Sequence, residues 1–465
     1  MSLFDKAVEE LSAKTRVLSG DDVLQKYRRD ALREFRGFRK TFHVKRLAVV
    51  FPKDTSEVVQ VVKTANKFGV AVIPVGGLTG LMGGAMPVSD CIVVDMKSMN
   101  KLLYFSGEDR LVSCEAGITI DELDKSLAAE GLMVGHDPWT RKYATVGGCI
   151  ATNGMGYTAA GYGSIRRQVL GLEVVLPTGE VLRTKDVEDN STGPSLTQLF
   201  IGSEGMLGII TKASLRVYPL PEKRTIVGYR FEGFEKGFKA LLKLYASDLI
   251  PSALEYGEVI ENPSDPAKDY DSELFMMFEG LEEIVDIKTK LADEMCRSFC
   301  GSRMEDSRPE EFWEHRHDIA GLYVENAERN NFWQNILFDF IHVSLPATKV
   351  LEYKRLSSQT LKKHRLWVVD RGIWKQPENF SIAFLKQTGR DIEDDLSKFS
   401  AAFDEMVELA HRLGGSMEYC HGVGIKLAKH MNDELGPAGL EVLKTIKSAL
   451  DPNNIMNPRK LIFPV

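Results

Sequence analysis

The pattern of apolar and polar positions changes near residue 47. Before it, residues 1–40 have a helical pattern, with the SGDDV segment offering a serine or aspartate cap ahead of LQKYRRDALREF. From there, LAVVFP and VAVIPVGG are short apolar runs, and TSEVVQVVKTANKFG between them has helical periodicity behind a cap at Thr55 or Ser56. A strand, a helix and a strand within roughly thirty residues predict a βαβ-type unit.

The rest of the chain continues this mixture of strands and helices in three parts. The first part closes near YPLPE at 218–222, the second carries long charged helices between apolar strands, and the third returns to glycine-rich segments. We therefore expect an α+β protein with parts at 1–220, 221–415 and 416–465, the last packing back on the first. Strands are expected at 91–96, 111–117, 172–184, 209–221, 225–231, 274–280 and 336–345, and helices at 118–131, 282–299 and 396–414.

Composition and charge exclude several classes of protein. The chain has 465 residues, 43% of them hydrophobic and 27% charged, as in ordinary globular proteins. Its net charge of -7 argues against nucleic-acid binding. No apolar run is long enough to cross a bilayer, and MSLFDKAVEELSAK does not have the pattern of a signal peptide. The expected location is the cytoplasm, with a peripheral position beside a membrane-bound partner as the alternative.

Six cysteines, at 91, 114, 149, 296, 300 and 420, do not form a disulfide pattern. Cys296 and Cys300 are spaced one helical turn apart without a second ligand pair. They are therefore expected to be a buried, reduced pair and not a structural zinc site.

Three glycine-rich segments carry the strongest functional signal. PVGGLTGLMGGAMP (74–87) directly follows an expected strand, a second run covers 136–181, and IGSEGMLGII (201–210) precedes another strand. Glycine lets backbone amides approach an anion closely, although 74–87 lacks the dinucleotide-binding GxGxxG spacing. Three such segments in one region indicate a large, elongated cofactor that carries phosphate.

The order of these segments resembles a known family. PVGGLTGLMGGAMP, VGGCIATNGMG, YGSIRRQVLGLEVVLPTGEV, LFIGSEGMLGIIT, HGVGIKLAK and LDPNNIMNPRKL together resemble the vanillyl-alcohol-oxidase superfamily. The similar branch contains D-lactate dehydrogenases, the glycolate oxidase flavin subunit and D-2-hydroxyglutarate dehydrogenase. The resemblance implies a two-subdomain PCMH-type FAD-binding domain over 1–220, an α+β cap or substrate domain over 221–415, and a C-terminal segment over 416–465.

That resemblance also implies which residues hold FAD. The first glycine loop would bind the pyrophosphate, the other two segments would line the ring and adenine ends, and Asn457 would lie near the flavin ring. With no histidine in 74–87 and His136 matching no known tethering position, non-covalent FAD is expected. The full set is Pro74, Val75, Gly76, Gly77, Leu78, Thr79, Gly80, Leu81, Pro138, Val146, Gly147, Gly148, Ala151, Thr152, Asn153, Gly156, Gly205, Gly208, Ile209, Ile210 and Asn457.

Oxidation of a hydroxy acid needs a base for the hydroxyl proton and a cation for the carboxylate. His421 in MEYCHGVG matches the catalytic histidine of the family, and Arg316 in FWEHRHDIA matches its substrate-binding arginine. Tyr419 is a candidate donor to the substrate oxygen. The alternatives are a plain loop histidine, an arginine in a surface helix pair and a packing aromatic.

Two departures from the family pattern stand out. The metal-binding segment of the branch is replaced by GIWKQPENFSIAF (372–384), with Ile373 and Ser381 in place of two histidines and Cys420 in place of a glutamate. No metal is therefore expected. Arg459 stands where the family has glycine.

Three functions remain open. The first is an FAD-dependent dehydrogenase or oxidase of a small D-2-hydroxy acid, with a quinone, a cytochrome, an electron-transfer flavoprotein or an iron–sulfur subunit as the electron acceptor. The second is a non-redox flavin transferase similar to alkyldihydroxyacetone-phosphate synthase, although only one of three histidines typical of it is present, at His421. The third is a flavin subunit that only relays electrons. The resemblance also implies a homodimer.

Overall fold

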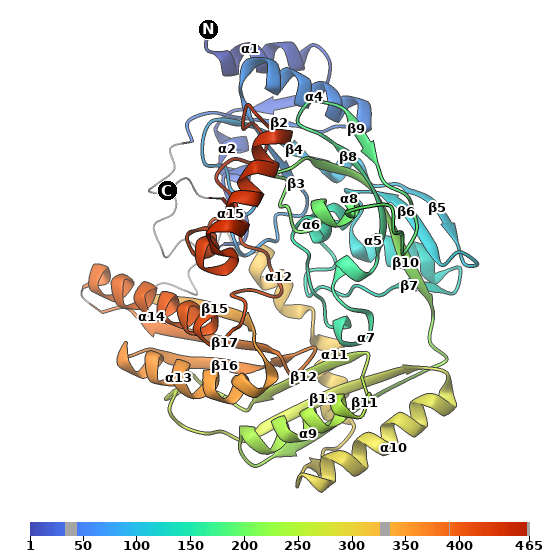
Figure 1. The fold of residues 1–465 in the computed structure, drawn as a ribbon, viewed down its shortest axis with the longest axis vertical. Helices are drawn as coiled ribbons and strands as arrows, with labels where there is room; N and C mark the ends of the chain where they lie inside the picture. The colour runs from blue at the N-terminus through green and yellow to red at the C-terminus, as the bar shows by residue number, and fades with distance from the viewer. Residues whose placement is uncertain (33–43, 326–334, 390, 463–465) are drawn as a thin grey trace. The chain divides into compact units, whose positions relative to one another are not determined.

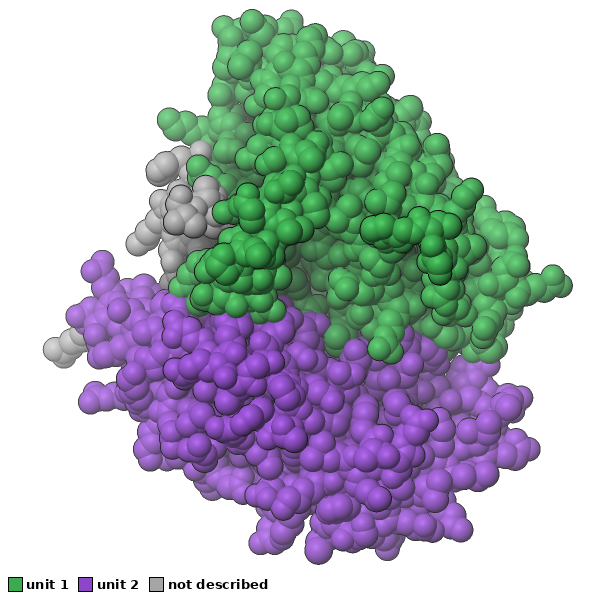
Figure 2. Space-filling view, in the orientation of Figure 1, with its two compact units in different colours: residues 1–155, 164–219, 420–465 green, residues 156–163, 220–419 purple. Residues whose placement is uncertain are grey.

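The computed structural model describes residues 1–32, 44–325, 335–389 and 391–462. The chain divides into two compact units (Figures 1 and 2). Unit 1 consists of Met1–Met155, Ser164–Pro219 and Cys420–Val465, and unit 2 consists of Gly156–Gly163 and Leu220–Tyr419. From Cys420 onward, the C-terminal segment thus belongs to the same unit as the N-terminal third of the chain.

The first sheet of unit 1 is buried on both faces. Helices α1 (Leu3–Ser12) and α4 (Thr55–Phe68) pack on one face against Ala48, Val50 and Val94, while alternate residues of the same strands pack with Tyr27 of α2 (Asp21–Tyr27) on the other. Burial of both faces explains the continuous apolar runs in the sequence. The strand order is β1 (Val17–Ser19), β2 (Leu47–Val50), β4 (Cys91–Asp95), β3 (Ala71–Val75), with β2 and β3 both parallel to β4.

The second sheet of unit 1 is antiparallel and is built around the long strand β10 (Ile209–Pro219), which pairs with β6, β7 and β8. Short helices line it, and α15 (Met431–Leu450) completes the unit. The remaining elements are β5 (Leu102–Ser106), β6 (Leu111–Glu115), α5 (Ile120–Ala128), β7 (Leu132–Val134), α6 (Val146–Ala151), β8 (Val169–Val175), β9 (Val181–Arg183) and α8 (Leu196–Phe200).

Unit 2 is a seven-stranded antiparallel sheet in the described part of the chain, ordered β14-β11-β13-β12-β16-β17-β15. Its strands are β11 (Lys223–Phe231), β12 (Ala253–Glu258), β13 (Ser272–Gly280), β14 (Ser302–Arg303), β15 (Ile336–Ser344), β16 (Trp367–Trp374) and β17 (Asn379–Gln387). Its helices are α7 (Ala159–Tyr162), α9 (Phe234–Ala246), α10 (Glu282–Ser298), α11 (Ser307–His315), α12 (Asp318–Glu325), α13 (Val350–Lys363) and α14 (Ile392–Arg412). Every described helix in the chain is too short or too polar to cross a membrane.

Three local expectations need correction. The side chain of Asp54, not Thr55 or Ser56, caps α4, because it accepts the N–H groups of Ser56 and Glu57. The helix expected over 24–35 ends at Tyr27, and residues 33–35 lie outside the described residues. All six cysteines are free, but Cys296 and Cys300 are not a buried pair: α10 ends between them, so Cys296 is buried and Cys300 is exposed.

Candidate functional site

The glycine loop after β3 packs its backbone directly against the segment before α6. A Cβ atom on Gly76 would lie 2.1 Å from Oγ1 of Thr145, and one on Gly77 would lie 2.1 Å from the carbonyl oxygen of Tyr143. Any side chain at these two positions would overlap its neighbours. At these two positions the peptide backbone of the loop therefore forms the wall of a cleft.

Two further glycine-rich walls face the same cleft in unit 1. Helix α6 begins at the N-cap Thr145, whose hydroxyl accepts the N–H of Gly148 at 3.2 Å. The segment before β10 brings in Gly205, which has a φ of +73° and whose Cβ would lie 2.5 Å from Pro74. The cavity that these walls bound has a volume of about 180 Å³.

Most of the residues expected to hold FAD line this cleft. They are Pro74, Val75, Gly76, Gly77, Leu78, Thr79, Gly80, Leu81, Pro138, Gly147, Gly148, Ala151, Thr152, Gly205, Gly208, Ile209 and Ile210. Val146, Asn153, Gly156 and Asn457 are not among the lining residues, and Gly156 belongs to unit 2. The side-chain amide of Asn457 instead donates to the carbonyl groups of Gly84 and Glu204, at 2.8 and 2.6 Å. Asn457 therefore links the loop after β3 to the segment before β10.

His136 is a lining residue that the sequence analysis did not select. It is 2% exposed, and among the described residues neither ring nitrogen has a hydrogen-bond partner. Burial lowers the pKa of His136 to about 4, so the imidazole is neutral at physiological pH and offers one donor and one acceptor to a ligand in the cleft. Its position in GHDPW, between an apolar strand and the second glycine run, was the available signal.

Two buried carboxyl groups also line the cleft. Burial raises the pKa of Asp30 to about 6 and that of Glu204 to about 7, while burial lowers the pKa of the nearby Lys460 to about 8. Nζ of Lys460 donates to the carbonyl group of Met86, and the carboxylate of Asp30 accepts the N–H of Leu32. Neither carboxyl was foreseen, because their approach to the cleft is a tertiary feature.

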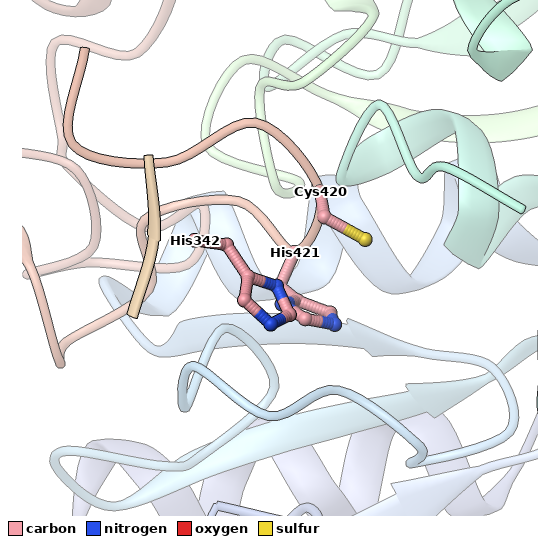
Figure 3. A group of neighbouring side chains, drawn as sticks. All are labelled: His342, Cys420 and His421. Carbon is pink, nitrogen blue, oxygen red and sulfur yellow. The ribbon is translucent and has the colours of Figure 1, made fainter. Parts of the chain in front are cut away.

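His421 lines the cleft together with Cys420. Figure 3 shows the side chains of these two consecutive residues. Both lie at the start of the C-terminal segment, and Sγ of Cys420 is 4.0 Å from the carbonyl oxygen of Met155. The backbone that follows is fixed on the glycine loop, because the N–H groups of Ile425 and Lys426 both donate to the carbonyl oxygen of Met82. Unit 1 therefore places a histidine side chain in the wall of the same cleft as the glycine loop.

Arg316 and Tyr419 belong to unit 2. The guanidinium carbon of Arg316 lies 3.7 Å from the ring centroid of Trp313, and the carbonyl group of Arg316 accepts the hydroxyl of Tyr157 at 2.9 Å. The ring of Tyr419 stacks on His342 of β15 with the centroids 5.4 Å apart. Each of the two side chains thus packs against a ring of the same unit, Arg316 against Trp313 and Tyr419 against His342.

The residues of the cleft fit FAD. Backbone-lined glycine loops suit a pyrophosphate, and the apolar lining from Met96, Ile209 and Ile210 suits a flavin or adenine ring. The buried, neutral His136 supplies the polar contact that a ring edge would satisfy. Fold and site together define a flavoprotein.

Comparison with known proteins gives the family. Residues 47–185 match the FAD binding domain family, and residues 220–461 match the C-terminal domain of FAD linked oxidases. The second match alone covers more than half of the chain, so the chain belongs to the FAD-linked oxidases. The expected family, the α+β fold, the FAD cofactor and the assignment as an enzyme are confirmed.

Individual relatives are more distant. A D-lactate dehydrogenase of Anaerostipes hadrus is 28% identical over 97% of this chain and 95% of its own length. An alkyldihydroxyacetonephosphate synthase of Dictyostelium discoideum is 26% identical over 89% of this chain and 73% of its own length. The crystal structure of p-cresol methylhydroxylase, 21% identical, matches with a TM-score of 0.79 over 99% of this chain and 97% of that chain. This last likeness shows the PCMH-type fold.

Proposed function

We propose that this enzyme oxidises a small 2-hydroxy acid of the D series to the 2-oxo acid, with FAD held non-covalently in the cleft of unit 1. The observation that carries the proposal is His421, a histidine in the wall of the cleft whose glycine loops and apolar side chains fit FAD. The similarity to a D-lactate dehydrogenase along nearly the whole chain supports the substrate class.

The proposed chemistry divides between the cofactor and three side chains. FAD, when bound, supplies a hydride acceptor at N5 of its ring. His421 takes the proton of the substrate hydroxyl, which frees the hydride on the same carbon. Arg316 holds the substrate carboxylate through two parallel hydrogen bonds, and Tyr419 donates to a substrate oxygen. The electrons then leave to a quinone, a cytochrome, an electron-transfer flavoprotein or an iron–sulfur subunit.

Replacement of the proposed base tests this assignment. In His421→Asn, the rate constant of flavin reduction by the best hydroxy acid should fall about 10²- to 10⁴-fold, as expected for loss of a general base. His315→Asn is the matched control, because that histidine is exposed and pairs with Asp318. Rapid mixing under anaerobic conditions measures both rates. An undiminished rate in His421→Asn would remove the histidine from the mechanism.

The carboxylate role of Arg316 has its own test. Arg316→Lys keeps the charge but loses the paired geometry, so the apparent Kd of the hydroxy acid should rise about tenfold, a loss of roughly 1.4 kcal/mol. The limiting rate of flavin reduction should change much less. A changed rate with an unchanged Kd would assign Arg316 to another task.

A transferase function is the second candidate, favoured by the similarity to alkyldihydroxyacetonephosphate synthase. Such an enzyme would consume an acylated ketone phosphate while its flavin stays oxidised overall. Incubation with that substrate and a long-chain alcohol, which would replace the acyloxy group, should give both the released fatty acid and the ether product if this candidate is right. Reduction of the flavin by a hydroxy acid would count against it.

A further inference from the structure

Glu204 is a buried carboxyl group whose partners lie on the turn that carries His421. Its side chain is 5% exposed, and its backbone has a φ of +49° ahead of strand β10. Oε1 accepts the N–H of Val423 at 2.6 Å, and Oε2 accepts the N–H of Gly424 at 2.9 Å. A single carboxyl group thus fixes the two peptide groups that lie two and three positions after His421.

The turn is also held from its other side by the glycine loop. A Cβ atom on Gly424 would lie 1.9 Å from the carbonyl oxygen of Met82, so the two backbones are in direct contact. The backbone carbonyl group of Glu204 accepts the side-chain amide of Asn457, which also donates to Gly84. Glu204 therefore joins the glycine loop and the His421 turn through both its side chain and its backbone.

Charged groups from two other segments face this carboxyl group. Asp30, which follows α2, raises the pKa of Glu204, while Lys460 of the C-terminal tail lowers it. Burial is the largest effect, the two amide donors oppose it, and the pKa of Glu204 lies at about 7. An ionised carboxylate accepts amide hydrogen bonds about twice as strongly as a neutral acceptor, so the hold on the turn depends on its charge.

We propose that Glu204 is a positioning residue for the oxidation: its carboxylate fixes the turn that places His421 in the wall of the cleft. The proposal rests on the proposed function only in giving His421 the role of base. Glu204 itself acts through the backbone of Val423 and Gly424.

Glu204→Gln tests this role, because it keeps the shape of the side chain and removes its charge. Hydrogen exchange of the peptide covering 421–427 should become about tenfold faster, since opening costs roughly 1.4 kcal/mol less when charge-assisted hydrogen bonds are lost. The rate constant of flavin reduction should fall about 10- to 100-fold, with the Kd of the hydroxy acid unchanged. The matched control is Glu115→Gln, a carboxyl group 5% exposed that accepts the N–H of Lys101 outside the cleft.

Unchanged exchange in Glu204→Gln would overturn the proposal, as would an unchanged reduction rate. If the wild-type enzyme is reduced by no hydroxy acid, the proposed function fails, and the exchange comparison still decides the positioning role. Glu204→Asp is the second variant should the glutamine variant lose FAD. The aspartate side chain is one methylene group shorter, so its carboxyl group should not reach both amides. Hydrogen exchange at the wild-type rate in a flavin-loaded aspartate variant would therefore also contradict the proposal.

A pH titration separates positioning from a merely structural role. In the His421→Asn holoenzyme, where no imidazole titrates at position 421, the flavin absorbance should shift with a midpoint near pH 7, following the pKa of Glu204. The shift should disappear when Glu204→Gln is added. A midpoint that survives in the double variant would place the titrating group elsewhere and contradict the proposal.

Discussion

At the scale of single residues, the glycine loop tolerates no added atom at its point of closest packing. The missing Cβ of Gly77 would lie 2.1 Å from a backbone carbonyl oxygen, which cannot rotate away as a side chain would. Gly77→Ala should therefore displace the loop and raise the Kd of FAD at least about tenfold, which corresponds to roughly 1.4 kcal/mol. Gly107→Ala is the matched control, because that position has open space around it. An unchanged Kd of FAD in Gly77→Ala would contradict the assigned packing.

Arg459 has a backbone conformation that favours glycine. Where the family has glycine, this chain has an exposed arginine with a φ of +61°. The left-handed conformation costs a residue with a Cβ roughly 1–2 kcal/mol, and glycine adopts it freely at some cost in chain entropy. Arg459→Gly should therefore stabilise the protein by about 0.5–1 kcal/mol. Chemical denaturation measures the free energy of unfolding. The control is Arg412→Gly at the end of α14, which should destabilise the protein. A loss of stability in Arg459→Gly would contradict a strained backbone at Arg459.

The buried imidazole of His136 links stability to pH. Its pKa is about 4 in the folded protein and about 6.5 when unfolded, so between these values the unfolded chain binds the extra proton. Stability conferred by this site is complete above pH 6.5 and is lost as the pH falls toward 4, by about 3 kcal/mol. In His136→Asn that part of the acid sensitivity should vanish. Urea unfolding at pH 4.5 and 7, with excess FAD throughout, measures the free energy of unfolding of both proteins. An equal loss of stability between the two pH values in wild type and variant would refute a neutral buried histidine.

At the scale of elements, the N-cap of α6 couples helix stability to the cleft. Loss of the Thr145 hydroxyl in Thr145→Val should cost about 1 kcal/mol of stability and let the first turn of α6, with Gly147 and Gly148, move. The Kd of FAD should then rise about tenfold. Ser195→Ala removes the N-cap of α8, which lies outside the cleft lining, and should cost similar stability with no change in FAD affinity. If both variants bind FAD with the same affinity, the N-cap of α6 does not contribute to FAD binding.

Periodicity predicts the elements of this chain better than their ends. The strands around Cys91–Asp95 and Ile209–Pro219 and the helix at Thr55–Phe68 were all expected, because apolar spacing is set by burial, which extends along a whole element. The cap at Asp54 was missed, because three consecutive residues can all cap a helix and only geometry selects one.

The candidate site was predictable where backbone chemistry defines it. Glycine clusters identified the walls of the cleft, since only glycine allows such close packing. Asp30 and Glu204 were not selected, because burial beside a cleft leaves no local pattern in the sequence, and the one signal for His136, its position in GHDPW, was not used. The contribution of residues 156–163 to unit 2 is likewise a tertiary property that a linear reading of the chain cannot provide.

At the scale of the whole molecule, each unit supplies a different part of the proposed chemistry. Unit 1 holds the cleft with its glycine walls and His421, and unit 2 carries Arg316 and Tyr419 on a separate antiparallel sheet. The FAD-binding domain match lies in the first 185 residues, and the FAD-linked oxidase match covers the Leu220–Tyr419 part of unit 2 and most of the C-terminal segment. The residues with proposed roles thus come from different units, so the measurement that tests these roles uses the complete chain.

An anaerobic titration of the purified holoenzyme tests the central claim most directly. D- and L-2-hydroxy acids are added in turn while the visible absorption of the flavin is recorded, and the 2-oxo acid is quantified. We expect that a D-2-hydroxy acid bleaches the flavin and yields one 2-oxo acid per flavin. A fully loaded yellow enzyme that no hydroxy acid bleaches would contradict it.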